Sequence, residues 1–336
     1  MDKLEKIVSL CKRRGFIFSG SEIYGGLAGA YDYGPLGILL KNNIKQSWWG
    51  TFVLGRDDIF GFDAAILMNS KTWEASGHLE YFTDRLTDTK EFNTMFKTSV
   101  GATEGTAFNI YLRPETAQGM FVNFKNIVDT FHPRLPFGIA QIGKAFRNEI
   151  APRDFLFRVR EFEQMEIEYF VRENQWQERF EEWRRATRDW IEAMGIASDH
   201  VIEHDVPQEE RAHYSKRTID FMYPYPFGKG ELYGLAYRTD FDLKAHGLSY
   251  YDEETKETLA PHVIEPSFGI ERLMLAILCE AYTEDEMGGE KRIMLKLNPK
   301  IAPIKIAVFP LLANKPDLIQ KAKEVYQKLK AKSWKL

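Results

Sequence analysis

Two long extended segments that lie close together in the chain constrain its fold more than any other feature. Residues 139–149 and 157–170 both show the period-two pattern of a strand, and the loop Ile150–Leu156, which contains Pro152, separates them. Two strands joined by a short loop are expected to pair as an antiparallel hairpin. Because alternate side chains share a face, one face of the second strand carries Arg158, Arg160, Phe162, Gln164, Glu166 and Glu168.

The composition of this face is unusual for a strand. Two arginines, an aromatic ring and several acids do not form a packing surface, whereas they suit a ligand that is both anionic and planar. Arginine donates two parallel hydrogen bonds to phosphate, and a phenylalanine ring can stack on a base. On the first strand Arg147 and Glu149 share a face. Spacing alone equally allows a solvated face of ion pairs, so both interpretations stay open.

The remaining patterns predict an α+β protein with an antiparallel sheet flanked by helices. Helical periodicity is clear near the N-terminus, after Pro35, over 176–194 and at the end of a strand–turn–helix unit within 260–282. Short strands are expected between residues 216 and 242. Strict alternation of strands and helices is missing, which argues against a doubly wound nucleotide fold. The glycine-rich segment 20–37 lacks the GK[ST] ending of a phosphate loop and indicates turns.

A change of pattern and charge predicts a domain boundary, with one domain over 1–298 and the beginning of another over 299–336. In the second, the run IKIAVFPLL (304–312) indicates a buried strand, and 318–329 an amphipathic helix. The second segment has nine lysines and two acids, or +7, so the first carries −11 of the total of −4. A basic module suits contact with a polyanion, although a solvated lysine-rich helix face explains the charge equally well.

Composition argues against several other classes of protein. No run of about 18 apolar residues occurs, so no membrane span is expected. Cys11 and Cys279 form no C-x-x-C pair, which gives a structural zinc site no support and favours buried thiols in a reducing, cytoplasmic setting. The histidines form no H-E-x-x-H pattern, and His204 and His213 are expected at the surface. A Ser/His or Cys/His hydrolase therefore has no support.

Two strings of residues resemble the signature motifs of a known enzyme class. FRNEIAPRDFLFRVREFEQMEIE (146–168) resembles motif 2 of the class II aminoacyl-tRNA synthetases, and PHVIEPSFGIERLMLAIL (261–278) resembles their motif 3. The resemblance implies a class II synthetase-like antiparallel sheet flanked by helices, followed by the start of an α/β anticodon-binding domain. The implied motif regions are 35–68, 139–170 and 261–282.

Three further strings narrow the resemblance to the dimeric glycyl-tRNA synthetases. They are GGLAGAYDYGPLG (25–37), WEASGH (73–78) and YLRPETAQGMFVNFKN (111–126). The resemblance implies activation of glycine with ATP and Mg²⁺ and transfer of the glycyl group to the 3′ end of tRNA(Gly). It also implies a homodimer and a cytoplasmic location.

The resemblance implies roles for individual residues in ATP binding. Arg147 holds the α-phosphate and the glycine carboxylate, Glu149 meets the adenine amino group, and Phe162 stacks under adenine. Arg272 faces the γ-phosphate, and Glu231 holds magnesium; without the resemblance, Glu231 would be interpreted as an ordinary strand-end acid. Arg147 and Arg272 are the implied catalytic pair. The full implied ATP-binding set is Arg147, Asn148, Glu149, Phe157, Arg158, Val159, Arg160, Glu161, Phe162, Glu231, Leu232, Gly269 and Arg272.

Glycine offers a binding site little more than its ammonium and its carboxylate. The glycine-binding set that the resemblance implies is Glu115, Phe162, Gln164, Glu166, Glu265 and Ser267. The three acids would surround the ammonium, with the serine assisting. When no cation is bound, their repulsion should raise the pKa of at least one acid. Without the resemblance, Glu115 could be a helix-start acid and Ser267 a turn hydroxyl.

Three features depart from the family pattern. The connection between His78 and Phe92 lacks the longer insertion that approaches the tRNA acceptor end, and the proline of motif 1 is not evident in GFDAAILMN (61–69). The chain also stops at Leu336, which leads us to expect a truncated anticodon-binding domain. Another class II synthetase-like adenylating enzyme and an inactive synthetase-derived binding protein are the alternatives. The motif arginines that inactive relatives lose are all present: Arg147, Arg158 and Arg272.

Overall fold

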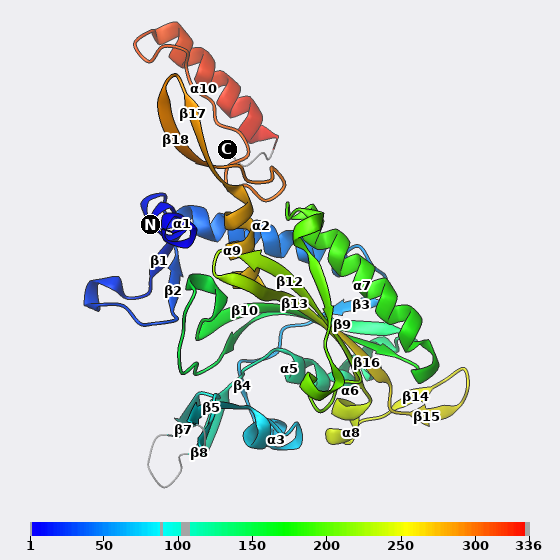
Figure 1. The fold of residues 1–336 in the computed structure, drawn as a ribbon. Helices are drawn as coiled ribbons and strands as arrows, with labels where there is room; N and C mark the ends of the chain where they lie inside the picture. Colours follow the sequence, from blue (N-terminus) through cyan, green and yellow to red (C-terminus); the bar gives the residue numbers. More distant parts are fainter. Residues whose placement is uncertain (1, 88–89, 102–107, 333–336) are drawn as a thin grey trace.

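A seven-stranded sheet forms the centre of the molecule (Figure 1). The structure is a computed structural model that describes residues 2–87, 90–101 and 108–332. The strand order is β11–β12–β13–β16–β10–β9–β3, and all neighbours are antiparallel except β3 and β9. The predicted α+β class with an antiparallel sheet is therefore confirmed. The strands are β3 (Ile59–Gly61), β9 (Phe137–Phe146), β10 (Glu161–Val171), β11 (Ile202–Asp205), β12 (Arg217–Tyr225), β13 (Gly228–Thr239) and β16 (His262–Gly269).

The predicted pair of long strands is present, but each strand is shorter than predicted at the end next to the connecting loop. β9 and β10 pair from Phe146 opposite Glu161 to Phe137 opposite Phe170. The connection contains a short 3-10 turn, and Asp154 at its start has φ 57°, outside the extended region. The expectation that one strand face begins at Arg158 is therefore wrong, because this turn interrupts the ladder.

Four helices and the sheet enclose the main core. The structure confirms the four helices predicted near the N-terminus, after Pro35, over 176–194 and within 260–282. They are α1 (Lys3–Arg13), α2 (Pro35–Phe52), α7 (Trp176–Ala193) and α9 (Ile270–Ala281). Phe268 of β16 lies 5.9 Å from Trp48, 5.5 Å from Phe52 and 5.5 Å from Trp190 between ring centroids. Aromatic contacts of this kind fix how α2 and α7 lie on the sheet.

The opposite face of the sheet is apolar at one end and polar at the other. Short helices cover the apolar end, where Phe124 lies 4.6 Å from Phe170 and 5.8 Å from Phe137. Along β10 the same face continues from Phe170 through Glu168 and Glu166 toward Phe162, as the alternation predicted. The helices are α5 (Ala117–Val122), α6 (Phe124–Phe131) and α8 (Phe241–Ala245), and a small hairpin of β14 (Tyr250–Asp252) and β15 (Glu257–Leu259) lies beside them.

A small lobe lies below the polar end of the sheet in Figure 1. The string WEASGH spans the junction of two of its helices. The short connection after His78 forms a hairpin, whose residues 88–89 lie outside the described residues. The lobe consists of β4 (Leu67–Met68), α3 (Ser70–Ala75), α4 (His78–Tyr81), β5 (Thr83–Thr87), β6 (Lys90–Asn93), β7 (Lys97–Val100) and β8 (Phe108–Leu112).

The glycine-rich segment forms an arm at the left of Figure 1. The arm begins with β1 (Ile17–Ser19), just before this segment, and continues through a 3-10 turn over Glu22–Tyr24 to β2 (Tyr31–Tyr33), which pairs with β1. Three of its glycines adopt positive φ: 94° at Gly25, 79° at Gly26 and 75° at Gly29. The prediction of turns rather than a phosphate loop agrees with this geometry.

The C-terminal part projects from the body at the top of Figure 1 as a hairpin and a helix. These are β17 (Tyr282–Met287), β18 (Glu290–Leu295) and α10 (Pro316–Ala331). The predicted helix is confirmed, but the predicted strand over 304–312 is wrong. The segment has no strand pairing, and Phe309 and Leu311 are 82% and 87% exposed. An apolar run becomes a buried strand when a neighbour pairs with it, and the described residues supply none here.

Other sequence predictions concern cysteines, histidines and membranes. Cys11 and Cys279 are both buried and free, and burial raises the pKa of each thiol to about 12. His204 and His213 are exposed, as expected. None of the helices in the described ranges is both long and apolar enough to span a membrane.

Candidate active site

The first of two cavities lies where β10, β13 and β16 meet the start of α9. It gathers residues from three distant parts of the sequence, including both motif arginines that were predicted to be catalytic. Ten of the thirteen implied ATP-binding residues line it. Its walls are Arg147, Glu149, Leu156, Phe157, Arg158, Val159, Phe162, Gln164, Glu231, Leu232, Tyr233, Ser267, Gly269, Glu271 and Arg272.

Arg272 and Glu231 form an ion pair in the wall of this cavity. The Arg272 Nη1 lies 2.9 Å from Glu231 Oε2 and also donates to the Glu231 backbone oxygen at 3.1 Å. The guanidinium lies 4.6 Å from the centroid of the Phe157 ring, which packs against it. Burial by itself would raise the pKa of Glu231, but Arg272 outweighs it, and the net shift is downward. The carboxylate therefore stays charged at neutral pH.

The loop between β9 and β10 holds two more arginines toward the cavity. Arg147 donates from Nε to the Pro114 backbone oxygen at 3.0 Å, and its guanidinium lies 5.2 Å from the Phe162 ring centroid. Arg158 Nε lies 2.5 Å from Glu149 Oε2. These contacts leave a planar ring and several positive groups on one wall, which suits a base joined to phosphates.

Three residues of the implied ATP-binding set lie outside this cavity. Asn148 turns toward the small lobe, where its N–H donates to the Thr94 backbone oxygen at 2.7 Å. Arg160 instead bonds the Glu149 and Ala28 backbone oxygens, and Glu161 forms an ion pair with Lys144 outside the cavity. Only Arg160 joins two loops by its side chain, since Asn148 acts through its backbone and Glu161 pairs across β9 and β10.

The second cavity adjoins the first and contains five of the six implied glycine-binding residues; the sixth, Phe162, lines the first. Both cavities share Arg147, Gln164, Glu231 and Ser267, so the two spaces meet at these four side chains. A segment between β11 and β12 covers the second cavity. Its lining includes Glu115, Glu166 and Glu265, together with Arg211, Tyr214, Asp220, Gly234 and Ala236.

Glu166 is held by side-chain donors on three sides. Thr116 Oγ1 donates to Oε2 at 2.5 Å, and Ser267 Oγ and Gln164 Nε2 donate to Oε1 at 2.7 and 3.3 Å. The carboxylate is 1% exposed. A buried carboxylate with these donors is fixed in place before any ligand arrives.

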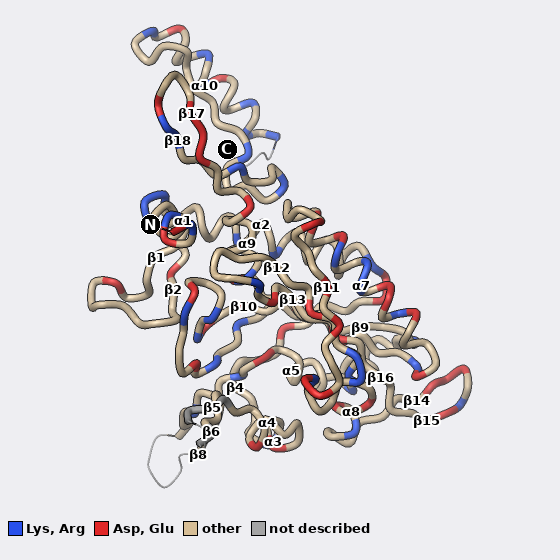
Figure 2. The backbone as a smooth tube through the Cα atoms, in the orientation of Figure 1, with Lys and Arg blue, Asp and Glu red and all other residues tan. Residues whose placement is uncertain are grey.

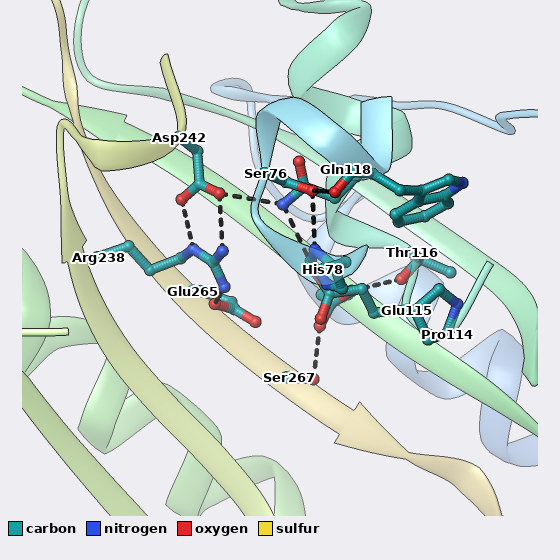
Figure 3. Close-up of polar contacts among 12 residues, drawn as sticks. Ser76, His78, Pro114, Glu115, Thr116, Gln118, Arg238, Asp242, Glu265 and Ser267 are labelled. Atoms are coloured by element: carbon teal, nitrogen blue, oxygen red, sulfur yellow. Dashed lines mark hydrogen bonds and ion pairs between the residues drawn. The ribbon is translucent and has the colours of Figure 1, made fainter. Parts of the chain in front are cut away.

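Glu265 and Glu115 are each paired with a buried cationic or ring-nitrogen partner (Figure 3). Arg238 donates from Nη1 to Glu265 at 2.5 Å and grips Asp242 with two bonds of 2.7 and 2.8 Å. His78 Nε2 lies 3.2 Å from Glu115 Oε1. Burial would raise the pKa of Glu115, yet His78 and the nearby arginines lower it to about 2.

The sequence did not identify several residues that hold these acids. His78 lies in the string WEASGH, but its partner Glu115 is 37 positions away in the chain. Arg238 lies near the end of β13 and Asp242 four positions later on α8, and Gln118 links Asp242 to His246 through bonds of 3.0 and 2.8 Å. The one available signal was Arg238, a charged residue inside an apolar strand. Buried charges occur in pairs, so this arginine indicated a buried acidic partner.

A sheet of this topology, with arginines and an aromatic ring around one cavity and buried acids around the adjoining cavity, agrees with the class of enzyme that the motifs resemble. Residues 96–281 match the family described as tRNA synthetase class II core domain (G, H, P, S and T). The chain therefore has the core of a class II aminoacyl-tRNA synthetase.

Similarity to individual proteins is more specific. The glycine–tRNA ligase of Caldanaerobacter subterraneus subsp. tengcongensis is 44% identical to the chain, and the alignment covers 98% of this chain and 84% of that protein. For the glycine–tRNA ligase of Thermus thermophilus the identity is 43%, with 98% and 83% covered, and for that of Lachnospira eligens it is 45%, with 97% and 84% covered. The chain belongs to the glycine–tRNA ligase family.

Proposed function

We propose that the chain forms glycyl-adenylate where the two cavities meet and then transfers the glycyl group to tRNA(Gly). The observation that carries the proposal is the shared wall of the cavities, with Arg147 between the phosphate side and the acidic side. ATP would lie in the first cavity, with adenine on Phe162. Glycine would lie in the second, its ammonium toward Glu115, Glu166 and Glu265.

No side-chain nucleophile is needed for this reaction. The glycine carboxylate attacks the α-phosphorus, a new O–P bond forms, and the bond to the pyrophosphate leaving group breaks. The terminal ribose hydroxyl of tRNA then attacks the glycyl carbonyl, and AMP leaves with the adenylate oxygen. The protein supplies position and positive charge, because charge on the phosphate oxygens is what must be stabilised.

Magnesium is part of the proposal, and Glu231 is the residue that would hold it. Its carboxylate is a hard oxygen donor that stays ionised and borders both cavities, which fits the ligands that Mg²⁺ prefers. Bound there, Mg²⁺ would neutralise phosphate charge. Asp220 lines the second cavity nearby, and burial followed by the Glu231 charge raises its pKa to about 6.

The proposal extends to the domains and the assembly. Residues 1–298 would form the catalytic domain, and 299–336 the beginning of an anticodon-binding domain that faces tRNA. A homodimer and a cytoplasmic location are inferred from the family. Light scattering of the purified protein tests the dimer.

Amino-acid-dependent ATP–pyrophosphate exchange tests the central reaction. With a panel of amino acids, glycine should give the fastest exchange. A faster reaction with another amino acid would contradict the proposed substrate, and no exchange with any of them would favour an inactive binding protein.

A further inference from the structure

Glu168 is a buried acid that the proposed reaction does not use. It lies on the face of β10 that carries Phe162, Gln164 and Glu166, next along the strand from Glu166. Its side chain has no exposed surface, and neither carboxylate oxygen has a hydrogen-bond partner among the residues that the structure describes. A charged carboxylate in such a place is costly, because no donor replaces the water that it has lost.

The surroundings of Glu168 have an apolar side and an acidic side. Its partner on β9 is Ile139, and the next residue on the same face of β10 is Phe170; both belong to the apolar cluster under α5 and α6. Toward the second cavity, one carboxylate oxygen from each of Glu166, Glu168 and Glu265 lies within 4.8 Å of the others. Three charges this close repel one another strongly, which favours a proton on one of the acids.

The charged groups that face Glu168 identify which acid that is. They are Glu166 on its own strand, Glu265 on β16, Arg238 on β13 and Asp242 on α8. Burial, and then the Glu265 charge, raise the pKa of Glu168 well above its usual value. Burial also raises the pKa of Glu265 well above its usual value. Arg238 donates to Glu265 and stabilises its charge, whereas no described group donates to Glu168.

We propose that Glu168 is a neutral carboxylic acid in the folded enzyme and acts as a positioning residue, which keeps Glu265 charged, held by Arg238 and available to the glycine ammonium. The inference rests on the proposed function, because the ammonium site at Glu166 and Glu265 is part of it. Three charged carboxylates would form a cluster suited to a divalent metal. With one acid neutral, the sheet face presents two charges, which suits a monovalent ammonium better.

Substitution of Glu168 tests the role of its neutral form. Glu168→Ala is expected to raise the KM for glycine about tenfold while the KM for ATP changes less than about twofold, since the packing around Glu265 is lost. Glu168→Gln has the same shape as the neutral acid and no charge, so its glycine KM should stay within about twofold of that of the original protein. An increase in Glu168→Gln equal to that in Glu168→Ala would overturn the proposal.

Glu166→Gln is the matched control, because it makes the same chemical change two positions away on the same face. Glu166 is proposed to be charged and to meet the ammonium, so this variant should raise the glycine KM more than about tenfold. If Glu166→Gln leaves the glycine KM unchanged, the proposed glycine site is wrong, whatever the result at Glu168. If Glu166→Gln behaves as expected and Glu168→Gln is equally impaired, the neutral state of Glu168 alone is refuted.

The pH dependence of stability gives a second test that needs no activity. A pKa raised in the folded state means that the contribution of Glu168 to stability is fully present below its unfolded pKa and is lost as pH rises toward the folded pKa. From about pH 5 to about pH 9, the Tm of the original protein should therefore fall relative to that of Glu168→Gln. Parallel Tm curves, or a relative loss in Glu168→Gln as pH rises, would show that Glu168 is charged.

Discussion

At the scale of single residues, two acids of the first cavity form ion pairs with arginines that the proposed reaction uses. Arg272 pairs with Glu231 at 2.9 Å, and Arg158 with Glu149 at 2.5 Å. Each of these acids lines the same cavity as its arginine. In this conformation the carboxylates stand where phosphate oxygens would compete for the same donors. Binding of ATP is therefore expected to exchange carboxylate contacts for phosphate contacts rather than to recruit arginines from solvent.

The first prediction concerns Arg147. Arg147→Ala removes charge-assisted hydrogen bonds to phosphate worth roughly 1.5–3 kcal/mol each, and more in the transition state. Glycine-dependent exchange should fall at least about a hundredfold while circular dichroism stays unchanged. Arg153→Ala is the control in the same loop, since this arginine is 62% exposed and pairs with Asp154. Near-normal exchange in folded Arg147→Ala would contradict the assignment.

The second prediction concerns His78, which holds Glu115. His78→Ala removes the contact at 3.2 Å and frees the carboxylate to rotate, so the glycine KM should rise roughly tenfold with little change for ATP. His204→Ala, at an exposed position, should leave both constants unchanged. Equal losses for glycine and ATP would indicate a general structural role for His78 instead.

The third prediction concerns selection against larger amino acids. The second cavity offers acids for an ammonium, and a methyl group forced into a filled site costs about 1–3 kcal/mol. Exchange with alanine should therefore be about ten to a hundred times slower than with glycine in kcat/KM. Comparable kcat/KM values for the two amino acids would refute steric selection.

At the scale of elements, α2 is fixed against the start of the chain by close backbone contact and by buried charges. Lys41 on α2 is 4% exposed and pairs with Glu271 at 2.9 Å and Glu163 at 2.6 Å. Glu271 also accepts from Tyr33 Oη and from the Glu163 N–H. This network joins α2, β2, β10 and α9 directly behind the first cavity. A change in how α2 packs is therefore expected to reach Arg272, the next residue after Glu271.

The fourth prediction uses two glycines of α2. A Cβ at Gly37 would lie 1.8 Å from the Phe16 backbone oxygen, whereas a Cβ at Gly50 would meet nothing within 4 Å. Gly37→Ala should lower the free energy of unfolding by about 2–4 kcal/mol, because backbone atoms must separate. Gly50→Ala should raise it by up to about 1 kcal/mol through helix propensity. Chemical denaturation measures both, and a Gly37→Ala protein of undiminished stability would contradict the close backbone contact between α2 and Phe16.

At the scale of the whole molecule, the proposed sites of adenylate formation and of tRNA contact lie in different parts of the chain. Both cavities lie within the body, and lysine positions are spread along α10 in the projecting part (Figure 2). The body extends slightly past the predicted boundary, since Ile301 is fully buried and Asn43 donates to its backbone oxygen at 3.0 Å. The two parts can therefore be tested separately.

The fifth prediction removes the segment after Pro303, which keeps Ile301 in the core. Glycine-dependent exchange should stay within about twofold, because no cavity residue is lost. Charging of tRNA(Gly) should fall several-fold, and its salt dependence should become shallower as lysine contacts to phosphate disappear. Unchanged charging at both low and physiological salt would show that 304–336 makes no contribution to tRNA binding.

The sequence by itself determined the local structure and the groups available for chemistry. Periodicity is a local property, so α2, α7 and the β10 face from Phe162 to Glu168 were predictable. The family resemblance implied residues for ATP and glycine binding, and the fold brings most of them around two adjoining cavities.

Tertiary structure decided which of these groups meet. The turn after β9 redirects Arg160 away from the cavity, and the absence of a described neighbour leaves 304–312 without a strand. His78 reaches Glu115 through contacts distant in sequence, and the proposed neutral state of Glu168 depends on burial beside two other acids. Burial, cross-strand distance and local dielectric follow from packing across the whole chain, so spacing in the sequence cannot set them.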